Sequence, residues 1–155
     1  MHWCISTLNE TIPSYVNTTF MLGFNEPNNS RNCNKSPQEV AAAWATVMAR
    51  WPNSQLVSPA TAGDGTPFFD AFFAECKTLY GAGGCKISYV AVHDYSCTAS
   101  ETMAYIDKIY QRYGYPVWLT EFSCGDGAQK KPTSDHLKYM KEIVPLLDAS
   151  PHVMR

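Results

Sequence analysis

Two glutamates lie at the ends of two short apolar runs. Glu26 closes the run FMLGFNE, and Glu121 closes the run VWLTE. If both runs are parallel strands, their carboxyl ends lie on the face where α/β folds place active sites. A carboxylate that is buried there without a partner costs free energy, so packing alone does not explain it. The pattern therefore predicts a paired-carboxylate site, in which one carboxylic acid protonates a leaving oxygen and the other attacks an anomeric carbon or activates water. The structural alternative is that each glutamate caps a loop or pairs with a surface cation.

The elements that must position these glutamates alternate between β-rich runs and helical patterns. We expect strands over residues 19–24, 55–58, 87–93 and 117–122, and the start of another at 152–154. Helices are expected over residues 37–51, 66–80, 98–113 and 133–149. Two of these helices begin with a sequence typical of a capping box, which pairs Ser36 with Glu39 and Thr98 with Glu101.

The spacing of the expected strands indicates the fold class. Strand–helix alternation with short connections is typical of βαβ units and a parallel sheet. The expected strand ends, near Glu26, Ser58, His93 and Glu121, are 32, 35 and 28 residues apart. Eight such units need about 250 residues, the size of a (β/α)8 barrel. With 155 residues, the chain is predicted to be an incomplete (β/α)8 TIM-type barrel of about five βα units, in a single domain over residues 1–155.

Composition excludes several classes of function. The 12 basic and 14 acidic side chains give a net charge of −2. The chain therefore has no excess of positive charge that would attract nucleic acid or an anionic membrane. Hydrophobic residues make up 45% of the chain, which is typical of a globular protein. No apolar run approaches 18 residues, so no membrane span is predicted. The first residues show no basic segment followed by an apolar one, so no signal peptide is predicted.

The six cysteines favour an oxidising compartment. Their even number predicts three disulfides. The sequence contains no C-x-x-C pair, the motif that is typical of a zinc knuckle or a redox site. Six cysteines allow 15 pairings. We favour Cys76 with Cys85, because a glycine-rich loop between them lets the chain turn back. The alternative is free buried thiols. Four N-x-[ST] sequons, which also slightly favour secretion, begin at Asn9, Asn17, Asn28 and Asn34.

An ordered set of motifs resembles one family. The set runs through LGFNEP at 22–27, PQEVA at 37–41, VSPA at 57–60, a phenylalanine-rich helix ending at Cys76, VAVHDY at 90–95, PVWLTEF at 116–122 and PHV at 151–153. The NEP motif alone is shared by a large clan of retaining (β/α)8 glycosidases. The ordered set covers nearly the whole chain and resembles glycoside hydrolase family 128, the alkali-sensitive-linkage-like glycosyl hydrolase catalytic core.

The resemblance implies an activity and a role for individual residues. It implies a secreted or wall-associated, retaining endo-β-1,3-glucanase that uses no cofactor and no metal. Glu26 would be the general acid/base, and Glu121 would be the nucleophile. Asn25 would bind the sugar 2-hydroxyl, and Tyr95 would orient Glu121. If these roles hold, the two carboxyl groups should lie about 5–5.5 Å apart.

Four further expectations concern residues near the predicted strand ends. Trp3 matches an early tryptophan of the family and would stack on a glucose ring. His93 would contact substrate or act as a hydrogen-bonded structural group. Because Cys97 and Cys124 each follow a strand end, they could form a bridge, as could Cys4 with Cys33 on the other side.

The chain also departs from the family pattern. The family has one or two strands before the position of Met1 and a final strand after the position of Arg155, so we expect the domain to be truncated at both ends. The alternative function is therefore a non-catalytic β-glucan-binding protein or an inactive fragment on the same scaffold. A third interpretation is a (β/α)8 glycosidase that acts on β-1,4-linked glycans. We expect a monomeric, extracellular or cell-wall protein whose partner is a β-glucan, with no nucleic-acid or membrane partner.

Overall fold

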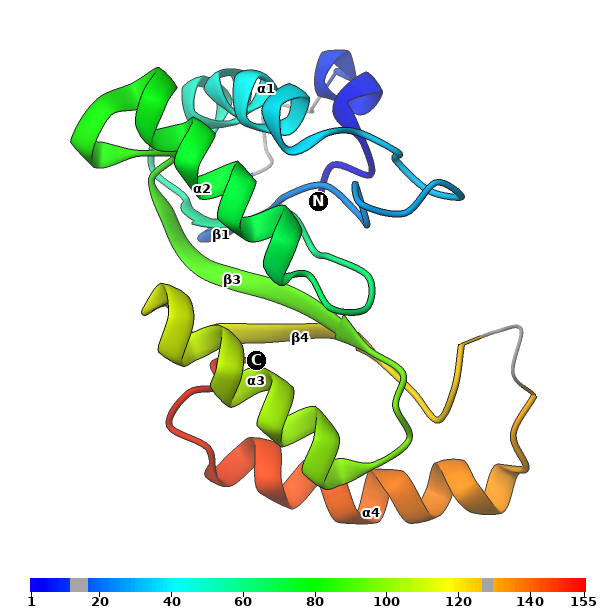
Figure 1. Cartoon of the computed structure of the whole chain (residues 1–155). Coiled ribbons are helices and arrows are strands. Elements are labelled where there is room, and N and C mark those ends of the chain that lie inside the picture. The colour runs from blue at the N-terminus through cyan, green and yellow to red at the C-terminus, as the bar shows by residue number, and fades with distance from the viewer. Residues whose placement is uncertain (12–16, 127–129) are drawn as a thin grey trace. The chain divides into compact units, whose positions relative to one another are not determined.

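The computed structural model describes residues 1–11, 17–126 and 130–155. These residues form two compact units, which comprise Met1–Ala91 and Val92–Arg155 (Figure 1). The four strands have the order β1-β2-β3-β4, and the boundary between the units falls within β3. Among the described residues, no helix is long and apolar enough to cross a bilayer.

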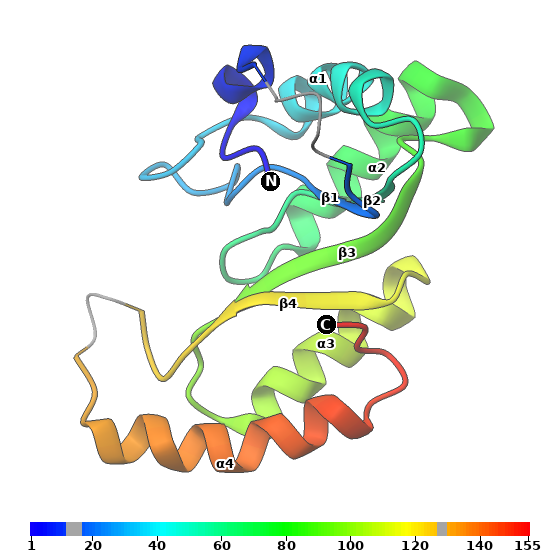
Figure 2. The same cartoon turned by 180° about the vertical axis from the view of Figure 1, so that it is seen from behind.

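The first unit is built from parallel strands and two long helices. Its chain runs through a 3-10 helix η1 (Ile5–Asn9), β1 (Phe20–Leu22), α1 (Pro37–Arg50), β2 (Gln55–Val57), α2 (Thr66–Tyr80), η2 (Gly81–Gly83) and the start of β3 (Ile87–Asp94). Strand β1 pairs parallel with β2, and β2 pairs parallel with β3 (Figure 2). The two long helices, α1 and α2, pack side by side (Figure 1).

A single tryptophan lies at the centre of the first unit's core. Trp44 on α1 is fully buried, and its ring makes edge contacts with Phe24 and Phe72 at centroid distances of 5.8 Å each. Its indole N–H donates to the carbonyl of Cys85 at 2.8 Å, so the polar end of the ring is satisfied. The core therefore ties both helices to the residues that follow β1.

The second unit repeats the same alternation. After the end of β3 it contains α3 (Ala99–Tyr113), β4 (Val117–Phe122) and α4 (Thr133–Ala149). The helices α3 and α4 lie side by side (Figure 1), and Tyr139 and Ile143 of α4 pack in a buried cluster with Ala99 and Cys124. Gly114 ends α3 in the left-handed conformation that favours glycine at this position.

Most of the predicted elements are confirmed, and the differences have local causes. The Ser36–Glu39 capping box is present, but the one predicted at Thr98 is wrong. The N–H of Thr98 donates to the hydroxyl of Ser96 at 3.4 Å, so Glu101 has no donor there to reach, and the Thr98 side chain makes no capping bond. Where another strand was expected to begin, Val153 forms an isolated parallel bridge with Val117.

All six cysteines form disulfides. The favoured pair Cys76–Cys85 is confirmed, together with Cys4–Cys33 and Cys97–Cys124. Each bridge lies within one unit, two in the first and one in the second.

Candidate functional site

A glycine sets the approach to Glu26. A Cβ atom at Gly23 would lie 2.7 Å from the Trp44 ring and 2.8 Å from the backbone nitrogen of Pro59, closer than real Cβ contacts allow. The N–H of Gly23 donates to the carbonyl of Val57 at 3.0 Å. Only glycine lets the backbone at position 23 lie this close to Trp44 and Pro59, so the glycine before Asn25 and Glu26 is required on steric grounds.

Backbone hydrogen bonds then fix Asn25 and Glu26 in buried positions. The Glu26 N–H donates to the carbonyl of Ala60 at 2.8 Å, and the Asn25 N–H donates to the carbonyl of Trp3 at 3.0 Å. Glu26 has a φ of 41°, in the left-handed region that residues with a Cβ adopt rarely. Such strain persists only where neighbouring bonds hold it, and it is common at functional sites.

Two asparagine side chains hold the carboxylate of Glu26. The side-chain amide of Asn29 donates to Glu26 Oε2 at 2.7 Å, and the amide of Asn32 donates to the same oxygen. The carboxyl group is nearly buried, with 6% of the residue exposed. The site therefore supplies neutral donors to one specific oxygen of the predicted acid.

Trp3 lies beside this part of the site. Its carbonyl accepts the Asn25 N–H, and 49% of the residue is exposed. A half-exposed indole next to a buried polar pair offers a flat apolar face and one N–H donor. The first unit thus brings Trp3, Asn25 and Glu26 together.

In the second unit, two aromatic side chains contact Glu121. The Tyr95 hydroxyl donates to Glu121 Oε2 at 2.6 Å. His93 Nε2 lies 3.6 Å from Glu121 Oε1, too far for a hydrogen bond but close enough for attraction when the imidazole is protonated. His93 is 1% exposed and the Glu121 side chain is 44% exposed, so the carboxylate is open to a ligand while its imidazole neighbour is fixed.

The residues that follow β3 and β4 are tied together, and this places Tyr95 near Glu121. The Gly125 N–H donates to the carbonyl of Tyr95 at 3.0 Å, and the Ser123 N–H donates to the carbonyl of Asp94 at 3.3 Å. The Cys97–Cys124 disulfide joins the same two segments, because Cys124 lies between Ser123 and Gly125.

A polar network that sequence reasoning missed anchors the segment after β3. The Oδ2 of Asp94 accepts from the hydroxyls of Ser96 at 2.7 Å and Thr102 at 2.6 Å. The Thr102 hydroxyl also lies 2.7 Å from the Tyr139 hydroxyl on α4. Burial raises the pKa of Tyr139, and the charge of Asp94 raises it further.

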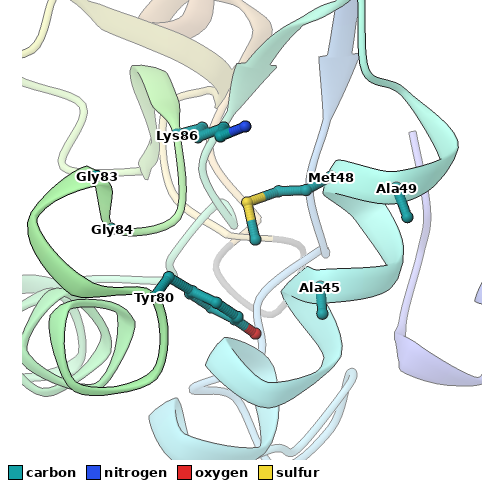
Figure 3. A pocket seen from close by; sticks show the side chains of 7 residues that line it. All are labelled: Ala45, Met48, Ala49, Tyr80, Gly83, Gly84 and Lys86. Carbon is teal, nitrogen blue, oxygen red and sulfur yellow. The ribbon is translucent and has the colours of Figure 1, made fainter.

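The first unit also has a pocket away from Glu26. It is an open depression with a volume of about 510 Å³, lined by Ala45, Met48, Ala49, Tyr80, Gly83, Gly84 and Lys86 (Figure 3). Lys86 directly precedes β3, so this lining belongs to the amino-terminal side of that strand, whereas Glu26 follows the carboxyl end of β1. Strand amino-terminal faces in such folds serve stability rather than catalysis.

The structure brings the predicted residues together in two sets. Trp3, Asn25 and Glu26 belong to the first unit, and His93, Tyr95 and Glu121 belong to the second. The carboxyl separation of about 5–5.5 Å stays a prediction. Asn29 and Asn32 were missed, although both are close in sequence to the NEP motif.

Comparisons with known proteins place the chain in a family. A model described as the glycosyl hydrolase catalytic core matches residues 4–155. Alkali-sensitive linkage protein 1 of Schizosaccharomyces pombe is 30% identical over 142 residues, which make up 87% of this chain and 26% of that protein.

Solved structures of family 128 glucanases match as well. A curdlan-specific exo-β-1,3-glucanase from Blastomyces gilchristii, solved with glucose, is 30% identical with a TM-score of 0.73, over 89% of this chain and 60% of that one. An endo-β-1,3-glucanase from Pseudomonas viridiflava is 30% identical with a TM-score of 0.73, over 88% and 56%. An exo-β-1,3-glucanase from Cryptococcus neoformans is 25% identical with a TM-score of 0.78, over 99% and 60%.

These matches bear on both fold and family. The predicted α/β architecture, a partial TIM-type fold of parallel strands and helices, is confirmed. The chain spans 26% of the curated relative and 56–60% of the solved ones. The family match extends from residue 4 to residue 155 and so covers both units. The chain therefore belongs to the glycosyl hydrolase catalytic core family and resembles its family 128 β-1,3-glucanases, as the motifs indicated.

Proposed function

We propose that this chain is a retaining endo-β-1,3-glucanase that hydrolyses β-1,3-glucan with two glutamates. Family membership supports the reaction class, and relatives at 30% identity carry the names of β-1,3-glucanases. The observation that carries the proposal is the environment of Glu121, an exposed carboxylate that accepts a 2.6 Å hydrogen bond from Tyr95. A phenol donor fixes the orientation of the carboxylate, and a nucleophile must be aligned with the anomeric carbon that it attacks.

In the first step, Glu26 acts as the acid and Glu121 as the nucleophile. The proton of Glu26 moves to the glycosidic oxygen, the bond between this oxygen and the anomeric carbon breaks, and a Glu121 oxygen bonds to that carbon. In the second step, Glu26 takes a proton from water, and the resulting hydroxide displaces Glu121 from the sugar. Two inversions at the same carbon leave its configuration unchanged.

Three further side chains are proposed to bind the sugar. Asn25 is buried directly before the acid and would bond the 2-hydroxyl, a contact that strengthens in the transition state. Trp3 would stack its exposed indole on a glucose ring. His93, whose Nε2 lies 3.6 Å from Glu121 Oε1, would contact the sugar or act as a structural group beside Glu121.

A digestion assay tests the proposal. Purified chain incubated with laminarin or curdlan should release reducing ends, and a mixture of oligosaccharide lengths would indicate endo action. Glu26→Gln and Glu121→Gln should each abolish release. Glu142→Gln, an exposed glutamate on α4, is the matched control and should retain activity. Release that survives both active-site variants would overturn the proposed roles.

The second candidate function is β-glucan binding without turnover. The half-exposed Trp3 favours it, because stacking on sugar requires no carboxylate. Co-sedimentation with curdlan separates the two candidates. Retention on the polymer without release of sugar, unchanged in Glu121→Gln and lost in Trp3→Ala, would support binding alone. Activity only on cellulose or mannan would instead support a β-1,4-glycosidase.

The proposed location is extracellular or in the cell wall. Three disulfides are typical of an oxidising compartment, and a polymeric glucan is reached most directly from outside the cell. We further propose a monomer with no nucleic-acid or membrane partner, in line with the net charge of −2.

A further inference from the structure

We propose that Thr102 is a positioning residue, which holds the segment after β3 so that the Tyr95 hydroxyl stays on Glu121. This inference rests on the proposed function and deepens it. Thr102 lies near the start of α3 and is fully buried. Its hydroxyl contacts two side chains outside α3, Asp94 at the end of β3 and Tyr139 on α4. All of these residues belong to the second unit.

The contacts of Thr102 form a chain of hydrogen bonds that ends on a carboxylate. Its single hydroxyl hydrogen goes to Asp94 Oδ2 at 2.6 Å rather than to the carbonyl of Thr98 at 3.2 Å, because the carboxylate is nearer and charged. The Tyr139 hydroxyl, 2.7 Å from the Thr102 oxygen, is then the donor to it. The chain therefore links the end of β3 to two packed helices.

The carboxylate at the end of this chain directly precedes Tyr95. Asp94 is the last residue of β3, and its Oδ2 also accepts the Ser96 hydroxyl at 2.7 Å. The residues on both sides of Tyr95 are thus bound to one oxygen atom, and that oxygen is held by Thr102. Fixing both neighbours fixes where the Tyr95 side chain begins, and its hydroxyl then reaches Glu121 Oε2 at 2.6 Å.

The backbone of the same segment has anchors of its own. The carbonyls of Asp94 and Tyr95 accept N–H groups from the segment after β4, and the Cys97–Cys124 disulfide joins the two segments. These anchors do not involve the Thr102 hydroxyl, so they remain when it is removed. Loss of the hydroxyl should therefore loosen the placement of Tyr95 without unfolding the unit.

Substitutions at Thr102 test the kinetic part on laminaripentaose. Thr102→Val removes the hydroxyl and keeps the branched shape. We expect kcat to fall about tenfold with KM nearly unchanged, because a misplacement of about 1 Å costs up to about 10²-fold and the loss arises in the transition state. Thr102→Ser keeps the hydroxyl and should restore kcat to near the wild-type value. A Thr102→Ser variant as slow as Thr102→Val would contradict the role of the hydroxyl.

Thr78→Val is the matched control. The Thr78 hydroxyl on α2 is exposed and donates to the carbonyl of Ala74, four residues earlier, at 3.1 Å. The substitution makes the same chemical change on a helix outside the network and should alter neither kcat nor KM. A loss of kcat equal to that of Thr102→Val would show that the effect is not specific to the network.

A double variant separates positioning from general damage to the site. If Thr102 acts through the Tyr95 phenol, adding Thr102→Val to Tyr95→Phe should lower kcat by less than about twofold, because the hydrogen bond to be positioned is already absent. Losses that multiply would overturn the proposal, since they would show that Thr102 acts by a route that does not include the phenol.

A spectroscopic measurement that needs no activity tests the structural part. In chain labelled with ¹³C at the tyrosine ζ carbons, the NMR signal lost in Tyr95→Phe identifies Tyr95. Glu121→Gln shows how far this signal moves when its acceptor becomes a neutral amide. Thr102→Val should move the same signal, and Thr102→Ser should leave it in place. An unmoved signal in Thr102→Val would overturn the proposal even if that variant were slow.

The two kinds of measurement keep the failures distinct. If the wild type hydrolyses no β-1,3-glucan, the proposed function fails, while the Tyr95 signal still decides whether Thr102 positions the phenol. Thermal melts show which variants are folded. If Thr102→Val does not fold, Tyr139→Phe takes its place, because it removes the donor to Thr102 and keeps the bond from Thr102 to Asp94. It should move the Tyr95 signal by a smaller amount, and an unmoved signal would again overturn the proposal.

Discussion

At the scale of single residues, the hydrogen bond from Tyr95 to Glu121 can be removed with one substitution. Tyr95→Phe deletes a donor to a carboxylate at 2.6 Å and keeps the ring. Hydrogen bonds to charged groups contribute about 1.5–3 kcal/mol, so kcat/KM on laminarin should fall about 10–100-fold. Tyr89→Phe, whose hydroxyl donates to neutral Gln55, is the control. Unchanged kinetics in Tyr95→Phe would show that the phenol does not orient the nucleophile.

The sequence pointed to the two glutamates of the site but not to the two asparagines that contact Glu26. Glu26 and Glu121 stand out because a carboxylate at the end of an apolar strand has no packing role. Asn29 and Asn32 do not, because asparagine after Glu-Pro is typical of a turn, and nothing in the spacing shows where its amide points. Their contact with Glu26 depends on the turns between residues 26 and 32, which only the structure reveals.

At the scale of elements, the start of α1 should respond to acid. The Ser36 backbone N–H, Lys35 and the Ser36 hydroxyl together lower the pKa of Glu39 from 4.5 to about 2. The folded state thus favours the carboxylate, so its stabilising effect is complete above pH 4.5 and is lost as the pH falls towards 2.

Glu39→Gln tests this effect. Urea unfolding midpoints of the wild type should fall between pH 5 and pH 2 by more than those of Glu39→Gln, and high salt should reduce the contribution of Lys35 because both side chains are exposed. Glu142→Gln serves as the control on another helix. Parallel pH profiles for the wild type and Glu39→Gln would contradict the role of the capping box.

The Tyr139 network should respond to alkali in the opposite sense. Burial, followed by the charge of Asp94, raises the pKa of Tyr139 above its usual 10. The folded state thus favours the neutral phenol, so its contribution is complete below pH 10 and is lost as the pH rises beyond the raised value.

Tyr139→Phe separates the two parts of this contribution. At pH 7 it should cost about 0.5–1.5 kcal/mol, because the Thr102 hydroxyl keeps its bond to Asp94 but loses the phenol. Above pH 10 the variant should lose less stability than the wild type in chemical unfolding. A steeper alkaline loss in the variant would argue against a favoured neutral phenol.

The bounds of the helices were predicted better than the length of β1 and the cap at Thr98. The bounds of α2 and α4 agree with the sequence, and each helix ends shortly before a residue that disfavours helix, Gly81 after α2 and Pro151 after α4. Strand β1 is shorter than expected, Phe20–Leu22 rather than 19–24, because the chain after Leu22 turns into the backbone contacts of Gly23 and Asn25. At Thr98, the backbone N–H that a capping box would direct to Glu101 donates instead to the hydroxyl of Ser96.

At the scale of the molecule, the disulfides should differ in their contribution. A crosslink that closes a longer loop removes more freedom from the unfolded chain. Cys4–Cys33 spans 29 residues and Cys76–Cys85 spans 9. Replacing the first pair with serine should cost about 3.6 kcal/mol and replacing the second about 2.6 kcal/mol. Denaturant unfolding of the two double variants checks the order, and the reverse order would contradict the loop-length account.

The fold class followed from the sequence because the strand spacing is regular. Separations near 32 residues between strand ends fit one strand and one helix. The described residues form four such units, where about five were expected, with parallel pairing of β1, β2 and β3. The sequence could not show that Val153 makes a single bridge, because a lone bridge and a strand share the same apolar pattern.

The central claim is that Glu26 and Glu121 hydrolyse β-1,3-glucan with retention, and the anomer formed first tests it most directly. Proton NMR of laminaripentaose during digestion distinguishes the α and β anomers before they equilibrate. We predict that the β anomer appears first with the wild type and that Glu121→Gln forms no product. An α anomer formed first, or a wild type that releases no sugar at any enzyme concentration, would contradict the account.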